Sequence, residues 1–313
     1  MRQPLQRAFA SLARTPVKQL QQPRPRMHLI FDFDGTITRR DTIGELARSA
    51  IARQQSHGGG GGGGLEAAWE QAVRDYGADY SAYRQEYRPA EAQRRSATDE
   101  VRYLAGLKSV EEASLDRVGR SGVFAGLGAD QLFCMGVEAV EARRVAVRDG
   151  FADLVELAAR RGWRVDVVSV NWSGAFIRGV IHPHRLAVTA NEISPDGHIR
   201  GPGGPLGADR ITTSPDKLRA VHHLIEAAAA DDNNSNTNRV LYFGDSATDM
   251  ECLLHEDGVV VADGRDSALM QVLGRIGVEV PHIGELPPHS RNDGVVLSWA
   301  SDFREVLDSG ILE

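Results

Sequence analysis

Two aspartates separated by a single residue end an apolar run, and their type and spacing are suited to proton transfer or to cation binding. Residues 28–34 read HLIFDFD, so the run ends in Asp32 and Asp34. Successive strand residues face opposite sides, so both carboxylates point the same way. Their crowding is costly unless a cation compensates the charge or one carboxyl keeps its proton. Gly35 follows and permits a sharp turn, which leaves the backbone N–H groups of that turn free to bind phosphate oxygens.

Further polar residues lie where other strands end or helices begin. They are Ser169, Lys217, Asp245 and Asp249. In an open parallel sheet the ligand crevice lies at the carboxyl ends of the strands, so we expect these side chains to meet the first aspartates there. Asp32, Asp245 and the main-chain carbonyl of Asp34 suit Mg²⁺, while Ser169 and Lys217 suit the charge of a transferring phosphoryl group. The set predicts phosphoryl transfer, with Asp34 as general acid and then base.

The order of apolar and amphipathic segments predicts an α/β fold with a mainly parallel sheet and helices on both faces. Strands are expected at residues 28–34, 163–170, 186–193, 239–245 and 258–262. Helices are expected at residues 150–161, 216–230 and 295–307. Pro195, Asp196 and Gly197 predict a turn of hairpin type.

A long helical block interrupts this alternation after the first strand. Residues 44–52, 65–76 and 130–147 have helical patterns, and residues 41–147 are therefore expected to form an inserted helical domain. The core is expected at residues 27–40 and 148–313. Inside the insert, residues 58–64 are seven consecutive glycines, which predict a flexible surface loop.

Composition narrows the classes of function. The 313 residues are 42% hydrophobic and 25% charged, with a formal net charge of -7, which argues against nonspecific nucleic-acid binding. No apolar run is long enough to cross a bilayer, so no membrane partner is expected. Cys134 and Cys252 lack the spacing of a zinc site, and a cytoplasmic location is the default. Residues 1–26 are basic and free of acids, which predicts a disordered tail or, alternatively, a mitochondrial presequence.

Four motifs together resemble those of the haloacid dehalogenase superfamily. They are FDFDGTIT at residues 31–38, Ser169 within VVSVN, Lys217, and GDSATD at residues 244–249. The resemblance implies a three-layer Rossmannoid core with a helical cap of the first type, a phospho-aspartyl intermediate on Asp32 and a Mg²⁺ site. The catalytic residues that it implies are Asp32, Asp34, Ser169 and Lys217, and the metal-binding residues are Asp32, Asp34, Asp245 and Asp249.

The segments VTANEI and PDGHIRG, residues 188–193 and 195–201, further resemble the phosphoserine phosphatase-like branch. Asp41 stands where those relatives carry an acid near the amino group of the substrate, although a helix N-cap explains it equally well. We place Asp41, Gly35, Thr36 and Asn171 in the substrate-binding set. The branch usually has Ser-Gly-Gly after the second strand, whereas this chain has Ser169-Val170-Asn171, which argues against phosphoserine itself as the substrate.

The leading hypothesis is a Mg²⁺-dependent phosphatase for a small phosphorylated metabolite. One alternative is phosphomutase-type transfer, in which the phospho-enzyme donates to a sugar instead of water. Another is a catalytically idle fold used for binding or regulation. The sequence leaves the identity of the metabolite and the oligomeric state open.

Overall fold

A computed structural model describes residues 27–57, 62–231, 239–286 and 295–313. The predicted basic tail, residues 1–26, lies outside the described residues. No helix within the described ranges is both long and apolar enough to span a membrane.

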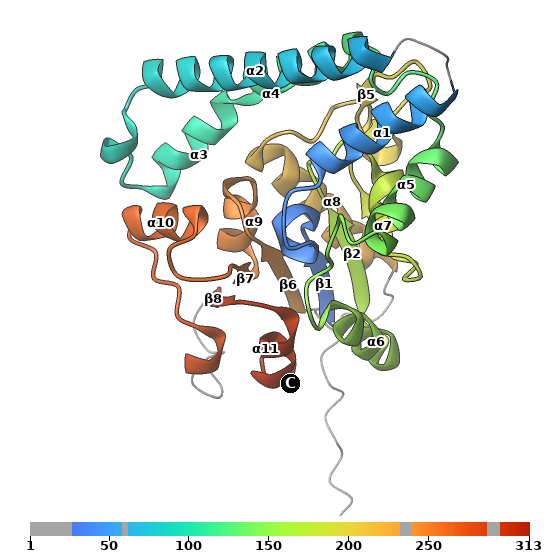
Figure 1. Cartoon of the computed structure of the whole chain (residues 1–313). Helices are drawn as coiled ribbons and strands as arrows, with labels where there is room; N and C mark the ends of the chain where they lie inside the picture. Colours follow the sequence, from blue (N-terminus) through green and yellow to red (C-terminus); the bar gives the residue numbers. More distant parts are fainter. Residues whose placement is uncertain (1–26, 58–61, 232–238, 287–294) are drawn as a thin grey trace, which may run out of the picture.

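Six parallel strands form the central sheet, in the order β3-β2-β1-β6-β7-β8 (Figure 1). Their bounds are β1 Met27–Phe31, β2 Arg164–Val168, β3 Ala187–Thr189, β6 Arg239–Gly244, β7 Asp257–Val261 and β8 Leu297–Ala300. The chain proceeds from β1 to one side of the sheet and later returns to β6 on the other. Strand β1 therefore lies at the switch point, where the crevice of such a sheet opens.

Helices cover both faces of the sheet. Leu29 and Phe31 pack on one face with α6 Phe151–Arg161, α7 Gly174–Val180 and α11 Phe303–Asp308. Ile30 faces the other side, with α8 Ser214–Asp231, α9 Met250–His255 and α10 Ala268–Arg275. The alternation in β1 thus feeds two separate apolar layers. The predicted three-layer α/β architecture is confirmed.

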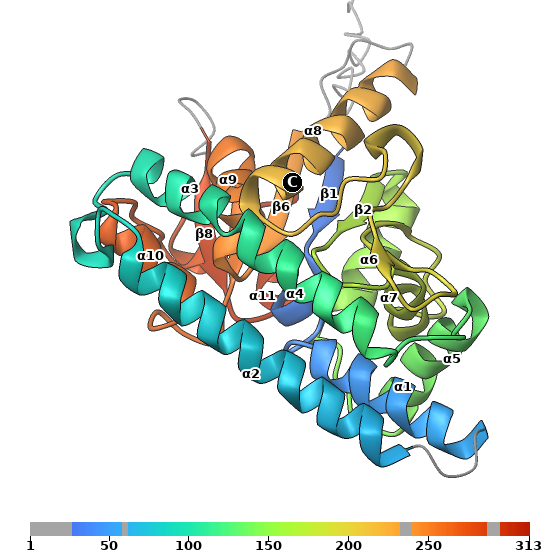
Figure 2. The same ribbon diagram turned by 90° about the horizontal axis from the view of Figure 1, so that it is seen from above.

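Among the described residues, five α-helices lie between β1 and α6 in the chain. They are α1 Ile43–His57, α2 Gly62–Glu86, α3 Ala97–Gly106, α4 Lys108–Ser121 and α5 Ala129–Glu141. The chain leaves the core and returns to it side by side, since Thr38 and Val147 form an antiparallel bridge. Helices α2 and α4 run side by side across the upper end of the sheet (Figures 1 and 2).

The hairpin predicted at residues 195–197 is present, because β4 Glu192–Ile193 and β5 Ile199–Arg200 pair antiparallel around it. The segment predicted as one strand at residues 186–193 is divided into β3 and β4. The side chain of Asn191 between them donates to the carbonyls of Val170 and Ile211, at 3.1 and 2.8 Å, which directs the chain away from the sheet.

Several predictions about elements were wrong in part. The strand predicted at residues 28–34 ends at Phe31, so Asp32 follows the strand and Asp34 lies in the turn Phe33–Ile37. The helix predicted at residues 295–307 is instead β8 followed by α11, because residues 297–300 pair with β7 and Asp302 caps a new helix through the N–H groups of Arg304 and Glu305. Helix α5 ends at Glu141 rather than at 147. Of the polyglycine run, Gly62–Gly64 belong to α2, and residues 58–61 lie outside the described residues.

Candidate active site

Asp32 follows β1 directly, at the carboxyl edge of the sheet. Its N–H donates to the carbonyl of Phe243 on the neighbouring strand β6, at 2.8 Å. The ring of Phe31, one residue earlier, stacks on that of Phe243 with centroids 4.5 Å apart. The side chain of Asp32 is buried, with 4% exposed, and accepts a short hydrogen bond from the ammonium of Lys217. Two packed strands therefore fix the position of this carboxylate.

Lys217 lies in the first turn of α8 and is fully buried. Its Nζ donates to Asp32 and, at 2.6 Å, to Oδ1 of Asp249. Burial alone lowers the pKa of this ammonium, but the charges of Asp249 and Asp32 outweigh burial and raise it above its usual value. Lys217 is therefore a permanent cation between two acids.

Asp249 is enclosed by donors from its own loop and from β6. Its Oδ1 also accepts from the hydroxyl of Tyr242 at 2.6 Å, and its Oδ2 accepts from the N–H groups of Asp245 and Ser246 at 3.2 and 3.0 Å. This carboxylate therefore orients Lys217 and the 245–249 loop.

Asp245 faces Asp32 from the end of β6 and contacts the turn Phe33–Ile37. Its Oδ1 accepts from the hydroxyl of Thr36 at 3.0 Å. Gly35 has φ +80°, and a Cβ at that position would lie 2.2 Å from Oδ2 of Asp245. Glycine is required here both for the left-handed conformation and for the close approach of the carboxylate.

The acidic cluster suits a divalent cation. Oxygens of Asp32, Asp245 and Asp249 all lie within 4.8 Å of one another. Burial, followed by the charge of Asp249, raises the pKa of Asp245 to about 7, and burial also raises the pKa of Asp32. Such shifts are the cost of crowded carboxylates that a cation relieves, and hard oxygen donors match Mg²⁺. The side chain of Asp34 is not in this group. The prediction that the main-chain carbonyl of Asp34 binds the metal ion stays a prediction.

Asp34 points to a different set of partners. Its Oδ1 accepts from the N–H and hydroxyl of Thr42 at 2.8 and 2.6 Å, and its Oδ2 accepts from the amide of Asn171 at 2.7 Å. Burial and then the charge of Asp41 raise its pKa to about 6, against the effect of these hydrogen bonds. The two motif aspartates therefore differ, because one is held by a cation and the other by neutral donors.

The remaining predicted residues lie around this pair. Ser169 is buried and its hydroxyl accepts from the N–H of Asn171 at 3.0 Å. Asp41 is exposed, and its carboxylate accepts from the N–H of Ile43, the first residue of α1, at 2.9 Å, so it satisfies a donor at the start of that helix. The predicted site residues thus converge on one region, although their roles remain predictions.

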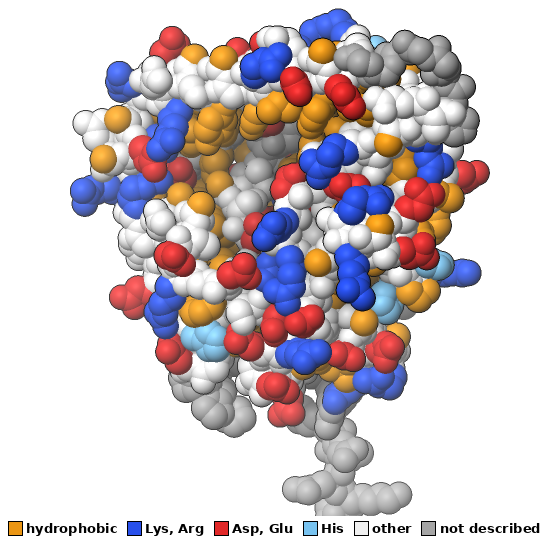
Figure 3. Space-filling view, viewed as in Figure 1, with side chains coloured by type: hydrophobic (Ala, Val, Ile, Leu, Met, Phe, Trp, Pro, Cys, Tyr) orange, Lys and Arg blue, Asp and Glu red, His pale blue; other side chains and the backbone are white. Residues whose placement is uncertain are grey.

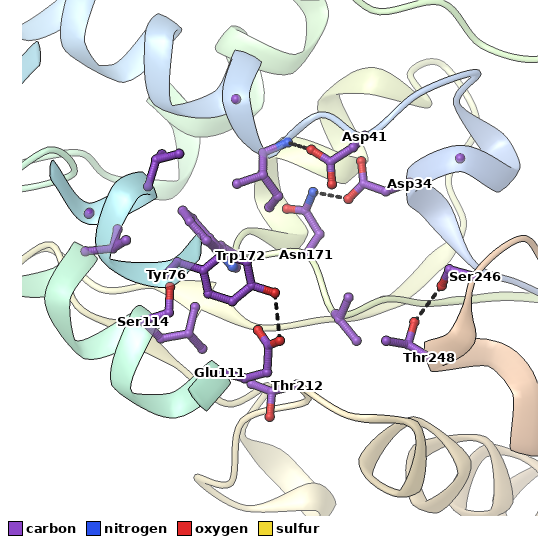
Figure 4. Close-up of a pocket in the computed structure, with 18 of the residues that line it drawn as sticks. Asp34, Asp41, Tyr76, Glu111, Ser114, Asn171, Trp172, Thr212, Ser246 and Thr248 are labelled. Carbon is purple, nitrogen blue, oxygen red and sulfur yellow. Dashed lines mark hydrogen bonds between the residues drawn. The ribbon is translucent and has the colours of Figure 1, made fainter. Parts of the chain in front are cut away.

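A cavity of about 560 Å³ lies against these groups, with Asp32, Asp34, Gly35 and Asp245 at one end. The space-filling view shows a hollow under the layer of α2 and α4 in which hydrophobic side chains gather (Figure 3). Figure 4 shows Asp34, Asp41 and Asn171 on one side of the cavity, with Tyr76 and Glu111 facing them from α2 and α4. The residues of this helical wall have no motif that marks them in the sequence.

Several positioning residues also escaped the sequence analysis. Arg148 is buried and donates to the carbonyls of Gly35 and Thr36, at 2.7 and 3.2 Å, and so holds the turn after Asp32. Thr42 and Tyr242 orient Asp34 and Asp249. In the sequence, Arg148 stands at the predicted start of the second core segment, directly after Val147. This position is the signal that could have identified it.

Comparison with known proteins gives the same family. The haloacid dehalogenase-like hydrolase model matches residues 29–254. A CTO1 family protein of Schizosaccharomyces pombe is 28% identical over 242 residues, covering 72% of this chain and 78% of that protein. Cold tolerance protein 1 of Saccharomyces cerevisiae is 24% identical over 263 residues, covering 76% and 80%. A solved phosphoserine phosphatase in apo form aligns over 90% of this chain and 98% of its own, with 13% identity and a TM-score of 0.47. Since the family model spans most of its length, the chain belongs to the haloacid dehalogenase-like hydrolase family.

Proposed function

We propose that this protein is a Mg²⁺-dependent phosphatase that hydrolyses a small phosphomonoester through a phospho-aspartyl intermediate on Asp32. The observation that carries the proposal is the different environment of the two motif aspartates. Asp32 is ion-paired to Lys217 beside two further acids, whereas Asp34 has a pKa of about 6 and neutral donors. A nucleophile must be ionised and a general acid must hold a proton. Lys217 and a bound divalent cation would offset the burial that raises the pKa of Asp32, whereas Asp34 has no hydrogen-bonded cation to keep it ionised.

In the proposed reaction a carboxylate oxygen of Asp32 attacks phosphorus, and the bond from phosphorus to the ester oxygen breaks. Asp34 gives its proton to the departing alcohol. Asp34, now ionised, then takes a proton from water as that water attacks phosphorus and releases Asp32. Inorganic phosphate leaves and both carboxyl groups return to their starting states. Lys217 and the N–H groups of the turn after Asp32 stabilise the phosphoryl oxygens.

Asp32 and Asp245 would hold the Mg²⁺ ion, with Asp249 positioning Lys217 and the loop beside it. When bound, the ion supplies positive charge that offsets the crowded carboxylates and the phosphate. We further propose that residues 41–147 act as a cap, because α2 and α4 supply the wall of the cavity opposite the aspartates. Such a wall admits a small ester and excludes bulk water.

The experiment is a comparison of wild type with D32N and D34N on p-nitrophenyl phosphate in Mg²⁺. D32N is expected to release no phosphate, because no nucleophile remains. D34N is expected to show a burst of p-nitrophenolate followed by slow turnover. The p-nitrophenolate leaving group departs without a proton, so the first step needs no general acid. The attacking water still needs a general base, whose loss slows the second step by about 100-fold or more.

The exposed Asp209 serves as the control, and D209N should keep wild-type kinetics. Full activity in D32N would remove the proposal. Transfer of the phosphoryl group to a sugar without release of inorganic phosphate would favour the phosphomutase alternative.

A further inference from the structure

The end of the cavity away from Asp32 differs in chemistry from the end that holds the aspartates. Aromatic and apolar side chains from α2, α4 and the loop after β2 form it, among them Trp69, Leu115 and Trp172. The rings of Trp69 and Trp172 meet edge to face with centroids 6.0 Å apart. The organic part of a substrate would therefore lie among aromatic side chains.

One charged group is set into this apolar wall. Glu111 on α4 accepts a hydrogen bond from the hydroxyl of Tyr76 on α2 at 2.9 Å. No lysine, arginine or histidine of the described ranges lies within ion-pairing distance of Glu111. Burial raises its pKa against the opposing effect of the Tyr76 hydrogen bond, which reflects a carboxylate without a compensating cation. Figure 4 shows the pair across the cavity from Asp34 and Asn171.

The lining is also one-sided in charge. Among the described residues that line the cavity there is no basic side chain. The acids that line it are Asp32, Asp34, Asp41, Glu111 and Asp245. A substrate with a carboxylate beyond its phosphate would find no cation there and would face Glu111. A neutral apolar group would bury that carboxylate without a counter-ion, which is also costly.

We propose that the substrate is a phosphomonoester of an amino or quaternary-ammonium alcohol, whose cationic nitrogen sits between Glu111, Tyr76 and the Trp69–Trp172 pair. Aromatic faces attract ammonium groups, and a carboxylate at the same end adds a counter-ion. The proposal deepens the phosphatase function and rests on it. Glu111 is then a specificity residue that recognises the part of the substrate that does not react.

The first test is a set of three esters that differ only at the end distant from phosphate. Choline phosphate carries a trimethylammonium group, 3,3-dimethylbutyl phosphate carries its neutral isostere, and 3-phosphooxypropanoate carries a carboxylate. We expect kcat/KM to fall in that order, by about 10-fold or more at each step. Equal or better hydrolysis of the neutral isostere would overturn the proposal while leaving the phosphatase function in place.

The second test locates the preference and uses E111Q, with E70Q on the exposed side of α2 as the matched control. E111Q should collapse the ratio of kcat/KM for choline phosphate over its neutral isostere, and E70Q should keep it. An unchanged ratio in E111Q contradicts the role of Glu111. The first test uses only wild type, so a folding defect in E111Q does not prevent a decision.

The third test needs no turnover. Choline and 3,3-dimethylbutanol are titrated into wild type, and tryptophan fluorescence reports on the ring pair. Choline should bind about 10-fold more tightly. Cation binding without hydrolysis of any ester would remove the phosphatase function but keep this cation site. Equal binding of the two alcohols would remove the cation site.

Discussion

The ammonium of Lys108 on α4 lies 2.7 Å from the carboxylate of Asp216 on α8, one residue before Lys217. Lys108 also donates to the carbonyl of Arg210 at 2.8 Å, and the guanidinium of Arg210 pairs with Asp116 on α4 at 2.7 Å. The helix that bears Glu111 is thus tied to the start of the helix that bears Lys217. The wall of the cavity and the ammonium proposed to act in catalysis are therefore held together by these contacts.

D216N should make the start of α8 less stable in a pH-dependent way. The carboxylate accepts from the N–H groups of Thr212 and Thr213, both at 3.1 Å, and from Lys108. Burial tends to raise the pKa of Asp216, but Lys108 and the threonine donors lower it below its usual value. A carboxylate whose pKa is lower in the folded than in the unfolded state stabilises the fold at pH values above its unfolded pKa of about 4. This contribution is lost as the pH falls through the folded pKa.

We therefore expect D216N to lose about 1–2 kcal/mol of unfolding free energy at pH 7 and the difference from wild type to shrink below about pH 4. Urea unfolding at a series of pH values measures this. The control is D209N. In wild type the carboxylate of Asp209 is exposed and has no hydrogen bond or ion pair within the described segments. A difference that persists unchanged at pH 3 would argue against the ionic origin.

Mg²⁺ should stabilise wild type, and D245N should separate metal binding from folding. Burial and then the charge of Asp249 raise the pKa of Asp245 to about 7, so D245N relieves both costs in the metal-free protein. We expect metal-free D245N to be at least as stable as wild type. Wild type should gain about 2.7 kcal/mol at a Mg²⁺ concentration of 100 times Kd, and D245N should gain little. Thermal shifts with and without Mg²⁺ test this, and an equal gain in D245N would place the ion elsewhere.

G35A should inactivate the enzyme beyond the cost of backbone strain. An alanine Cβ at position 35 would press on the Asp245 carboxylate, which lies 2.2 Å from the ideal Cβ position. The matched control is G277A, because Gly277 has the same φ of +80° and nothing within 4 Å of that position. Both variants should lose about 1–2 kcal/mol of stability from strain.

Only G35A should also lose about 100-fold in kcat/KM, because small displacements of reacting groups have that effect. Phosphate release assays together with urea unfolding separate the two contributions. Comparable activity in the two alanine variants would mean that Asp245 tolerates displacement.

R148K should loosen the turn after Asp32. The guanidinium of Arg148 donates to Gly35, Thr36 and Ser301 carbonyls and to Asp263, and a lysine ammonium does not span this fork of acceptors. We expect a loss of about 2–3 kcal/mol in unfolding free energy, because buried carbonyls lose their donors. A fall in kcat should accompany it.

The control is R39A at the exposed pair with Asp149, whose side chains are 42% and 53% exposed. It should change stability by less than about 1 kcal/mol. If R148K loses no more unfolding free energy than R39A, the turn after Asp32 keeps its conformation without Arg148.

The local pattern of the sequence determined the strands that precede Asp32 and Asp245, and the order of these strands along the chain. The period of two in residues 28–34 put Leu29 and Phe31 on one face and Ile30 on the other, and strand-end acids follow because parallel strands end at one edge. Residues 295–307 were misassigned for the opposite reason. Residues 297–300 pair with β7, 39 positions earlier in the chain, and this pairing outweighs local helix propensity.

Only the tertiary structure decided how the environments of the two carboxylates differ. Asp32 and Asp34 are equivalent in a strand pattern, but Lys217 reaches only the first, while Thr42 and Asn171 reach the second. The same holds for Tyr76 and Glu111, which are 35 residues apart and meet only because α2 packs on α4. Electric fields and hydrogen bonds act through space, so the chemistry of a carboxylate depends on neighbours that local sequence periodicity does not specify.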